Sequence, residues 1–478
     1  MIFTSFEFVA FFATLLLLCG LLRNFNAKTW LLLIASWLFY MSWSVPCVLL
    51  IIFTSLLDWS IARKLAQTTD ASRRKNLLVT SLTMSLGLLA FFKYSNFFLD
   101  NLGELLRLLG TNVTLRHYSY ILPPAISFYT FSSMGYVLDV YYERTPVCQS
   151  ARDYTLFTAF FPKLLSGPIV KAGEMLPQIK ERLRITAEDA EIGLSYCLIG
   201  AVKKMVVADQ IAPHVNLIFS APAQYDGPTL LVGLMGYAVQ IYCDFSGYSD
   251  MAIGFARILG FRLPENFQMP YSASSITEFW RRWHMTLSKW FRDYVFLPLE
   301  IATRGNPYPN VRVSINILAM MLLVGLWHGP SWNYVIFGGI HGLALVIHKL
   351  WTGWRPLESL KKHAVGKHAW TVCAHLLTLG VALLSFVFFR TPTFAEAMSY
   401  LGRLLHWQHD GTRLDSPYIA AAVGAVLLTH LLIRKDRNLA LELPSRSMSL
   451  RIVSYTAFFL LLVLLGATDS SPFIYFQF

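Results

Sequence analysis

Charged residues are scarce in this sequence. Asp, Glu, Lys and Arg make up only 14% of the 478 residues, whereas 55% of the residues are hydrophobic and 15% are aromatic. A typical soluble domain contains about 25% charged residues. This chain is too apolar for an ordinary soluble globular protein, and its composition predicts an integral membrane protein.

Sequence motifs typical of soluble nucleotide-binding enzymes and of repeat proteins are also missing. The sequence contains no nucleotide-binding loop, no glycine-rich dinucleotide fingerprint and no repeat of fixed period. The six cysteines show neither paired nor metal-like spacing, so we interpret them as inert thiols. They are Cys19, Cys47, Cys148, Cys197, Cys243 and Cys373. Any chemistry is therefore expected from isolated polar groups within an apolar bundle.

Long apolar runs recur along the chain, most of them near the roughly 17 to 25 residues that a helix needs to cross a bilayer. We predict an all-α polytopic protein of about 11–12 transmembrane helices with additional re-entrant and interfacial helices. It forms a single domain over 1–478, with core motifs at about 118–350 and peripheral helices at 1–100 and 365–470. The predicted spans are 2–22, 29–43, 46–62, 77–98, 119–141, 189–219, 228–245, 311–327, 332–350, 369–389, 416–434 and 452–468.

The first run lacks the pattern of a cleaved signal peptide and is predicted to be a retained helix. The net charge of +12 is spread over short basic clusters between apolar runs, which indicates membrane topology and not nucleic-acid binding. Placing these clusters inside puts both termini outside, with the apolar tail 471–478 beyond the membrane or at its surface. The clusters comprise Arg23, Lys28, Arg63, Lys64, Arg73, Arg74, Lys75, Lys361, Lys362, Lys367, Arg434, Lys435, Arg437, Arg446 and Arg451.

Two stretches do not fit simple spans. Prolines and a glycine interrupt the apolar run 160–168, which predicts a re-entrant segment. The stretch 244–254 places Asp244, Asp250 and several hydroxyls against an apolar span. Such acids must be paired or line a wet cavity, and helix-end capping explains them as well as a functional role does.

The stretch 275–294 is predicted to be an amphipathic helix at the cytoplasmic interface. Ser275 and Glu278 have the spacing of a capping box, which marks a helix start. One face carries the aromatic and apolar residues Trp280, Trp283, Leu287, Trp290, Phe291 and Tyr294 together with His284, and the other carries Arg281, Arg282, Lys289 and Arg292. His284 is predicted to point inward.

Two interpretations of this helix remain open. By its spacing, His284 is either a structural residue hydrogen-bonded to a neighbour or part of a reaction centre. The basic face suits either anionic lipid or a phosphate-bearing donor such as coenzyme A, because both are polyanions.

His328 lies between two long apolar runs, in the stretch 325–334. An ionisable residue within a membrane is functional by default, and a neutral imidazole can take a proton from a hydroxyl near neutral pH. Gly325, Gly329 and Pro330 are expected to loosen the backbone so that something can approach closely. The neighbouring Trp327 and Asn333 are candidate substrate-binding residues. A metal site is not predicted, since His341 and His348, at seven-residue spacing, are only a weak hint.

Together, 281–294 and 325–329 strongly resemble the membrane-bound O-acyltransferase family, and especially its bacterial alginate O-acetyltransferase branch. Supporting stretches are 122–131, 136–141, 160–170 and 244–254. The resemblance implies a helical bundle around a tunnel, with His328 at the position of the catalytic histidine and His284 at that of the second histidine. It also implies that acetyl groups are taken from a cytoplasmic thioester and exported to an extracytoplasmic polysaccharide.

From these features we expect acetyl-CoA or another acyl thioester as co-substrate, with no tightly bound cofactor and no metal. The donor docks on Arg281, Arg282, Lys289 and Arg292, and His328 serves as general base. We further expect the bacterial inner membrane as location and a periplasmic hydrolase-like acetyltransferase as partner. The alternative is a transporter or polymer-export subunit without acyl chemistry. Eukaryote-like acylation of lipid or protein is disfavoured by the branch-specific stretch around His284.

Overall fold

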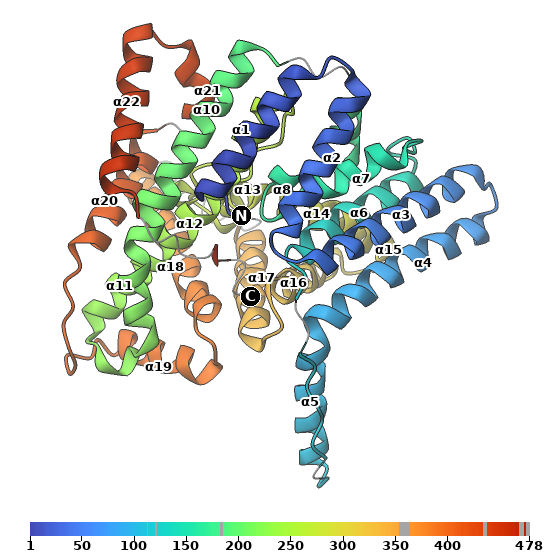
Figure 1. Cartoon of the computed structure of the whole chain (residues 1–478). Helices are drawn as coiled ribbons and strands as arrows, with labels where there is room; N and C mark the ends of the chain where they lie inside the picture. Colours follow the sequence, from blue (N-terminus) through green and yellow to red (C-terminus); the bar gives the residue numbers. More distant parts are fainter. Residues whose placement is uncertain are drawn as a thin grey trace. The chain divides into compact units, whose positions relative to one another are not determined.

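The computed structural model describes residues 1–111, 113–119, 122–181, 185–352, 364–433, 437–467 and 473–474, with no side chains described for 364–367. Within these ranges the chain is helical and contains no strand beyond one isolated bridge between Tyr225 and Thr412 (Figure 1). The all-α prediction is confirmed. Several residues used to predict the topology, including Lys361, Lys362, Arg434 and Lys435, lie outside the described residues.

Seven helices of the described chain are long and apolar enough to cross a membrane. They span Val45–Gln67, Ala71–Leu108, Gly227–Ile258, Pro309–His328, Trp332–Thr352, His368–Arg390 and Met448–Leu465. Two further predicted spans correspond to the shorter apolar helices Phe6–Leu21 and Pro417–Leu432. The predicted spans 29–43, 119–141 and 189–219 fall on helical segments that do not meet these limits. The chain is a multi-pass membrane protein.

The chain divides into two compact units, and the first comprises Met1–Cys197 and Met251–Pro264. Within it, α3 packs against α4, α6 and α7. Its helices are α1 (Phe6–Leu21), α2 (Phe25–Met41), α3 (Val45–Gln67), α4 (Ala71–Leu89), the π-helix η1 (Ala90–Tyr94), α5 (Ser95–Leu108), α6 (Ile126–Tyr141), α7 (Ala151–Ala159), α8 (Phe161–Leu164), α9 (Ala172–Lys180) and most of α10 (Ala187–Ala201).

The predicted re-entrant stretch 160–168 belongs to this unit. Helix α7 ends at Ala159, and α8 then adds only four residues before the chain turns again. A Cβ atom on Gly167 would lie 3.0 Å from the carbonyl oxygen of Pro162, so the tight turn leaves no room for a side chain there. The prediction that this apolar stretch is not a continuous helix is confirmed.

The second unit comprises Leu198–Asp250 and Glu265–Phe478. Within it, α16 packs along α17, which in turn packs on α13 and α18. Its helices are the π-helix η2 (Val202–Ala208), α11 (Asp209–Ser220), α12 (Gly227–Ile258, up to Asp250), α13 (Ile276–Arg282), α14 (Met285–Phe291), the π-helix η5 (Arg292–Phe296), α15 (Leu297–Ala302), α16 (Pro309–His328), α17 (Trp332–Thr352), α18 (Ala364–Arg390), α19 (Phe394–Leu405), α20 (Pro417–Leu432), α21 (Leu439–Glu442) and α22 (Met448–Leu465); short 3-10 turns lie at η3 (Pro222–Gln224), η4 (Pro270–Ser272) and η8 (Leu443–Ser445).

The two acids of the stretch 244–254 lie inside the long helix α12 and do not cap a helix end. Asp244 pairs with Lys204 at 2.6 Å and also accepts a hydrogen bond from the backbone N–H of Ile474. Asp250 pairs with Lys203 at 2.6 Å. Each acid is thus compensated by a cation, which is how charges are tolerated in an apolar bundle.

Candidate active site

The predicted continuous interfacial helix is interrupted at His284. Helix α13 ends at Arg282 and α14 begins at Met285, while His284 adopts a left-handed backbone conformation with φ of 43°. The prediction of one helix over 275–294 was wrong at this point, although Ser275 does cap the start by accepting a hydrogen bond from the N–H of Glu278. A non-glycine residue with positive φ is strained, and such strain clusters at functional sites.

Asn266 holds this break in place from a distant part of the sequence. Its backbone carbonyl accepts a hydrogen bond from the N–H of Met285 at 2.9 Å. Its side-chain oxygen accepts from the N–H of Thr286 at 3.2 Å and from the Thr286 hydroxyl at 2.9 Å. These bonds satisfy donors at the start of α14 that have no partner within the helix. Asn266 thereby replaces the previous helical turn and makes the kink possible.

The same amide oxygen lies 3.1 Å from Nδ1 of the His284 ring. A backbone N–H can only donate, so the atom of Asn266 that faces Thr286 must be the oxygen. The amide nitrogen then donates to the hydroxyl of Ser249 at 3.3 Å. Because an amide oxygen only accepts, the hydrogen of a neutral His284 ring lies on Nδ1.

Aromatic rings enclose the imidazole of His284, which is 0% exposed. Its centroid lies 4.7 Å from that of Phe245 and 6.3 Å from that of Phe267. Burial lowers the pKa of His284 to about 3, so the ring is neutral at physiological pH. Its Nε2 has no hydrogen-bond partner among the described residues. A neutral ring with hydrogen on Nδ1 carries its basic lone pair on this nitrogen.

His328 is the last residue of α16 and is 4% exposed. Its ring packs edge-on against Phe337 at 5.4 Å and Phe389 at 5.1 Å between centroids. The position between two apolar helices, predicted from the sequence, is confirmed because α17 begins at Trp332.

The indole of Trp327 contacts both histidines. Its ring centroid lies 5.9 Å from that of His284 and 5.0 Å from that of His328. The two motifs, more than forty residues apart in the sequence, therefore meet at one aromatic residue. This convergence gives the site its core, with one imidazole on either side of Trp327.

The glycines near His328 have a different role from the predicted one. Cβ atoms on Gly325 and Gly338 would overlap the carbonyl oxygens of Tyr334 and Met321, respectively. A Cβ atom on Gly329 would overlap the ring of Tyr334. The chain leaves the helix at Gly329 and Pro330, as expected, but α16 stays helical through Gly325 to His328. The missing side chains let α17 pack closely against α16.

Asn333 lies in the first turn of α17 and is buried. Its amide nitrogen donates to the carbonyl oxygen of Thr391 at 2.9 Å. This bond ties the start of α17 to the residue that follows α18. The amide nitrogen of this predicted substrate-binding residue is therefore already engaged by the protein.

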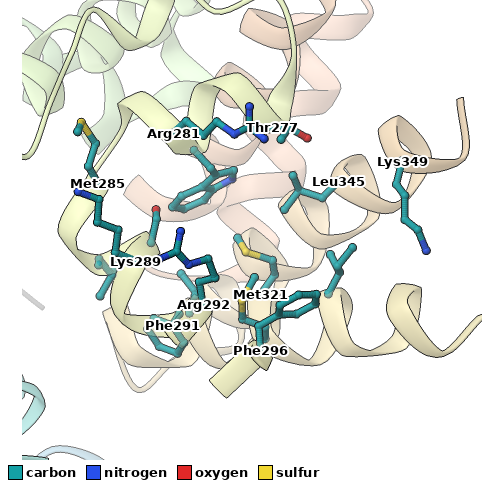
Figure 2. Close-up of a pocket in the computed structure, with 16 residues that line it drawn as sticks. Thr277, Arg281, Met285, Lys289, Phe291, Arg292, Phe296, Met321, Leu345 and Lys349 are labelled. Atoms are coloured by element: carbon teal, nitrogen blue, oxygen red, sulfur yellow. The ribbon is translucent and has the colours of Figure 1, made fainter. Parts of the chain in front are cut away.

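A pocket of about 490 Å³ opens beside the first histidine motif. Figure 2 shows Arg281, Lys289 and Arg292 around it, carried by α13, α14 and η5, with Lys349 extending from α17 on the other side. The remaining lining is mainly apolar and includes Met321. Such a pocket has positive charge at its edge and an apolar interior.

Three of the four cations predicted to bind the donor thus line one pocket. Arg282 does not line it, and its guanidinium pairs with Glu278 at 3.0 Å and donates to the carbonyl oxygen of Gln268. Arg292 lines the pocket although it pairs with Asp293 at 2.8 Å. Lys349 is the fourth cationic residue among those that line the pocket. It was not predicted, since a lysine in the last turn of a spanning helix has no local signal beyond membrane topology.

The described residues contain no group of three or more His, Cys, Asp or Glu side chains placed to hold a metal ion. His341 and His348, whose spacing was a weak hint of a metal site, form hydrogen bonds to other side chains. His341 bonds to Trp280 and Ser385, and His348 bonds to Thr277.

The chain matches a known protein family over most of its length. Residues 24–379 match the model of the membrane-bound O-acyltransferase family. The chain belongs to that family. The resemblance in the sequence and the predicted enzyme class, an O-acyltransferase, are thereby confirmed. The transporter alternative, which predicted no acyl chemistry, is disfavoured by membership of an acyltransferase family.

Several relatives of this membrane-bound O-acyltransferase are named as acyl-transferring proteins. A probable alginate O-acetylase of Pseudomonas aeruginosa is 38% identical over 351 residues, which cover 73% of this chain and 66% of the relative. A peptidoglycan O-acetyltransferase of Helicobacter pylori is 33% identical, covering 78% and 73%. A teichoic acid D-alanyltransferase of Streptococcus thermophilus is 29% identical, covering 55% and 67%. The chain thus spans about two thirds of the length of these relatives.

Proposed function

We propose that this protein transfers an acetyl group from acetyl-CoA, bound on the cytoplasmic side, to a hydroxyl that arrives from the other side of the bacterial inner membrane. The observation that carries the proposal is the convergence of both histidine motifs on Trp327 in a member of an acyltransferase family. The end product of the proposed route is an O-acetylated extracytoplasmic polysaccharide. Both termini lie on the periplasmic side.

The pocket beside α14 supports a phosphate-bearing donor. Arg281, Lys289 and Arg292 offer several cationic donors at its edge, and phosphate groups are recognised by such clusters. The apolar interior suits the thin, weakly polar arm that connects the phosphates of coenzyme A to its thioester. The pocket reaches the first histidine motif at Met285 and Ser288, although neither His284 nor His328 is among its lining residues.

The proposed transfer needs one proton acceptor. His328 takes the proton of the acceptor hydroxyl as its oxygen attacks the thioester carbonyl. The bond from carbon to sulfur then breaks, an oxygen ester forms, and the thiolate leaves and recovers the proton from His328. General-base catalysis of this kind contributes on the order of a hundred-fold or more in rate. His284 helps to position the donor.

The named relatives support a polysaccharide as final acceptor, since they include alginate and peptidoglycan O-acetyltransferases. A periplasmic hydrolase-like acetyltransferase that receives the acetyl group and passes it to the polymer completes the proposed route.

The test is transfer of labelled acetyl groups from acetyl-CoA by the purified protein in nanodiscs, with and without the periplasmic partner. We expect label on the partner or polymer with the wild type and with His406→Ala, which changes an exposed histidine outside the site. We expect none above background with His328→Ala. Full transfer by a His328→Ala protein that inserts and folds normally would overturn the assigned base. Absence of transfer by the wild type with partner and polymer present would overturn the proposed function.

Direction is tested in sealed vesicles. Acetyl-CoA added to the cytoplasmic face of inverted vesicles should be consumed, whereas acetyl-CoA offered only to the periplasmic face should not. Equal consumption from both faces would contradict a cytoplasmic donor site.

A further inference from the structure

The amide of Asn266 makes contacts that a helix cap alone does not require. Its oxygen caps the start of α14 by accepting a hydrogen bond from the backbone N–H of Thr286. The same oxygen also lies within hydrogen-bond distance of the His284 ring. Its nitrogen is held by Ser249, which fixes the orientation of the amide. Asn266 is 1% exposed, so water does not compete for these bonds.

We propose that Asn266 is a positioning residue that holds His284 as the Nδ1–H tautomer, so that Nε2 accepts a hydrogen bond from an N–H or O–H group of the substrates. This inference rests on the proposed function, because it assigns a substrate group as the hydrogen-bond partner of Nε2. The hydrogen on Nδ1 is directed at Asn266. The lone pair of Nε2 has no partner among the described residues and requires a donor.

The chemistry of the substrates limits what this donor can be. A thioester carbonyl and its developing oxyanion offer only lone pairs, so Nε2 in this tautomer cannot stabilise them. The attacking hydroxyl has a single hydrogen, which the proposed transfer gives to His328. The groups left to donate to Nε2 are the amide N–H groups in the arm of the thioester donor and a neighbouring, non-reacting hydroxyl of the acyl acceptor. His284 is thereby assigned to recognition of a hydrogen-bearing substrate group and not to oxyanion stabilisation.

The surroundings of the ring keep this tautomer neutral. Phe245, Phe267 and Trp327 pack on it, and none of these side chains titrates. Asp244, which precedes Phe245, is paired with Lys204. Burial lowers the pKa of His284. His284 lies in the stretch between two candidate membrane spans and not within a span.

The first test reads the tautomer directly in protein labelled with ¹⁵N-histidine in nanodiscs. The His284 signals are those lost in His284→Gln. We expect a protonated Nδ1 and an unprotonated Nε2 in the wild type, and a mixture of tautomers in Asn266→Ala. A wild-type ring protonated at Nε2 would overturn the inference. This spectrum requires no turnover, so it decides the inference even if acetyl transfer fails.

The second test uses a conservative substitution. Asn266→Asp keeps an oxygen that caps α14 and accepts from Nδ1, but its negative charge raises the pKa of His284. Protonated His284 has no lone pair on Nε2. Transfer by Asn266→Asp should therefore equal that of the wild type at high pH and fall as the pH drops through the raised pKa, where the wild type is still active. A pH profile identical to that of the wild type would contradict the positioning role.

A matched control is Asn316→Ala. Asn316 is also a buried asparagine of the second unit, and its amide bonds to Glu300 and Thr303, away from the histidines. We expect Asn266→Ala to lower kcat roughly tenfold, less than the loss of a proton-transfer group itself, while Asn316→Ala keeps the wild-type tautomer and pH profile. Equal losses of kcat per folded molecule in both variants, with an unchanged His284 spectrum, would leave Asn266 a purely structural residue.

The substrate group that donates to Nε2 is identified with a truncated acetyl thioester that lacks the amide-bearing arm. If the arm donates, Asn266→Ala weakens transfer from acetyl-CoA more than transfer from the truncated donor. If a non-reacting hydroxyl of the acceptor donates, both donors lose the same factor. Either pattern supports the acceptor role of Nε2. No loss with either donor would overturn it.

Discussion

His284 and His341 are both buried imidazoles of the second unit, each 0% exposed and packed among aromatic rings. Both ring nitrogens of His341 are used by the protein. Nδ1 accepts from the indole N–H of Trp280 at 3.3 Å, and Nε2 lies 2.9 Å from the hydroxyl of Ser385. His284 has only its Nδ1 engaged, and its backbone has a positive φ.

This difference teaches how a packing histidine is told from a functional one. Burial does not separate the two residues. An unfilled acceptor and a strained backbone do, because a buried polar atom without a partner costs about 1–3 kcal/mol and is retained where something else fills it. By this criterion His341 joins α17 to α13 and α18, and His284 is the candidate for a functional role.

The largest effect is expected from His328→Ala, which tests whether His328 is the proton acceptor. Removing a general base should lower kcat on the order of a thousand-fold, because this group carries the proton in the proposed transfer. Single-turnover transfer of labelled acetyl groups measures the loss. A decrease in kcat of less than tenfold would show that His328 is not the general base.

His284→Ala should cause a smaller loss, on the order of a hundred-fold. The ring is expected to orient a substrate group and not to carry the proton, so some transfer remains. The same labelled assay, run with thermal unfolding of the nanodisc protein, separates catalysis from folding. A larger loss than in His328→Ala would reverse the roles given to the two histidines.

Neutralising the pocket edge should affect donor binding. The triple substitution of Arg281, Lys289 and Arg292 by Gln is expected to raise KM for acetyl-CoA roughly tenfold, since charged hydrogen bonds to phosphate are lost while the histidines stay in place. Arg282→Gln, whose guanidinium pairs with Glu278, is the control and should leave KM nearly unchanged. A fall in kcat with constant KM would disprove a donor-binding role.

The smallest effect on transfer is expected from His341→Ala. Its ring makes two hydrogen bonds between helices, so its loss should lower the unfolding free energy by about 1–2 kcal/mol. The kcat per folded molecule should stay within about twofold of the wild type. Thermal unfolding and the acetyl transfer assay report the two quantities, and a catalytic loss as large as that of His284→Ala would erase the distinction between these residues.

Much of the site was predictable because its signals are local. The apolar runs predicted the spans, and the spacing of polar residues placed His328 at a helix end and three cations at one edge. The break at His284 was not predictable. Its aromatic stripe has helical spacing across the break, and the bonds that stabilise the kink come from Asn266, which lies 18 residues earlier.

The sequence by itself determined the all-α membrane class, the family and the two candidate histidines, since composition, run length and motif identity are properties of the chain alone. Only the tertiary structure decided that both histidines meet at Trp327, that glycines serve close packing of α16 on α17, and which nitrogen of His284 lies against Asn266. These features depend on contacts between residues far apart in the chain, and the periodicity of hydrophobic residues along the sequence does not predict such contacts.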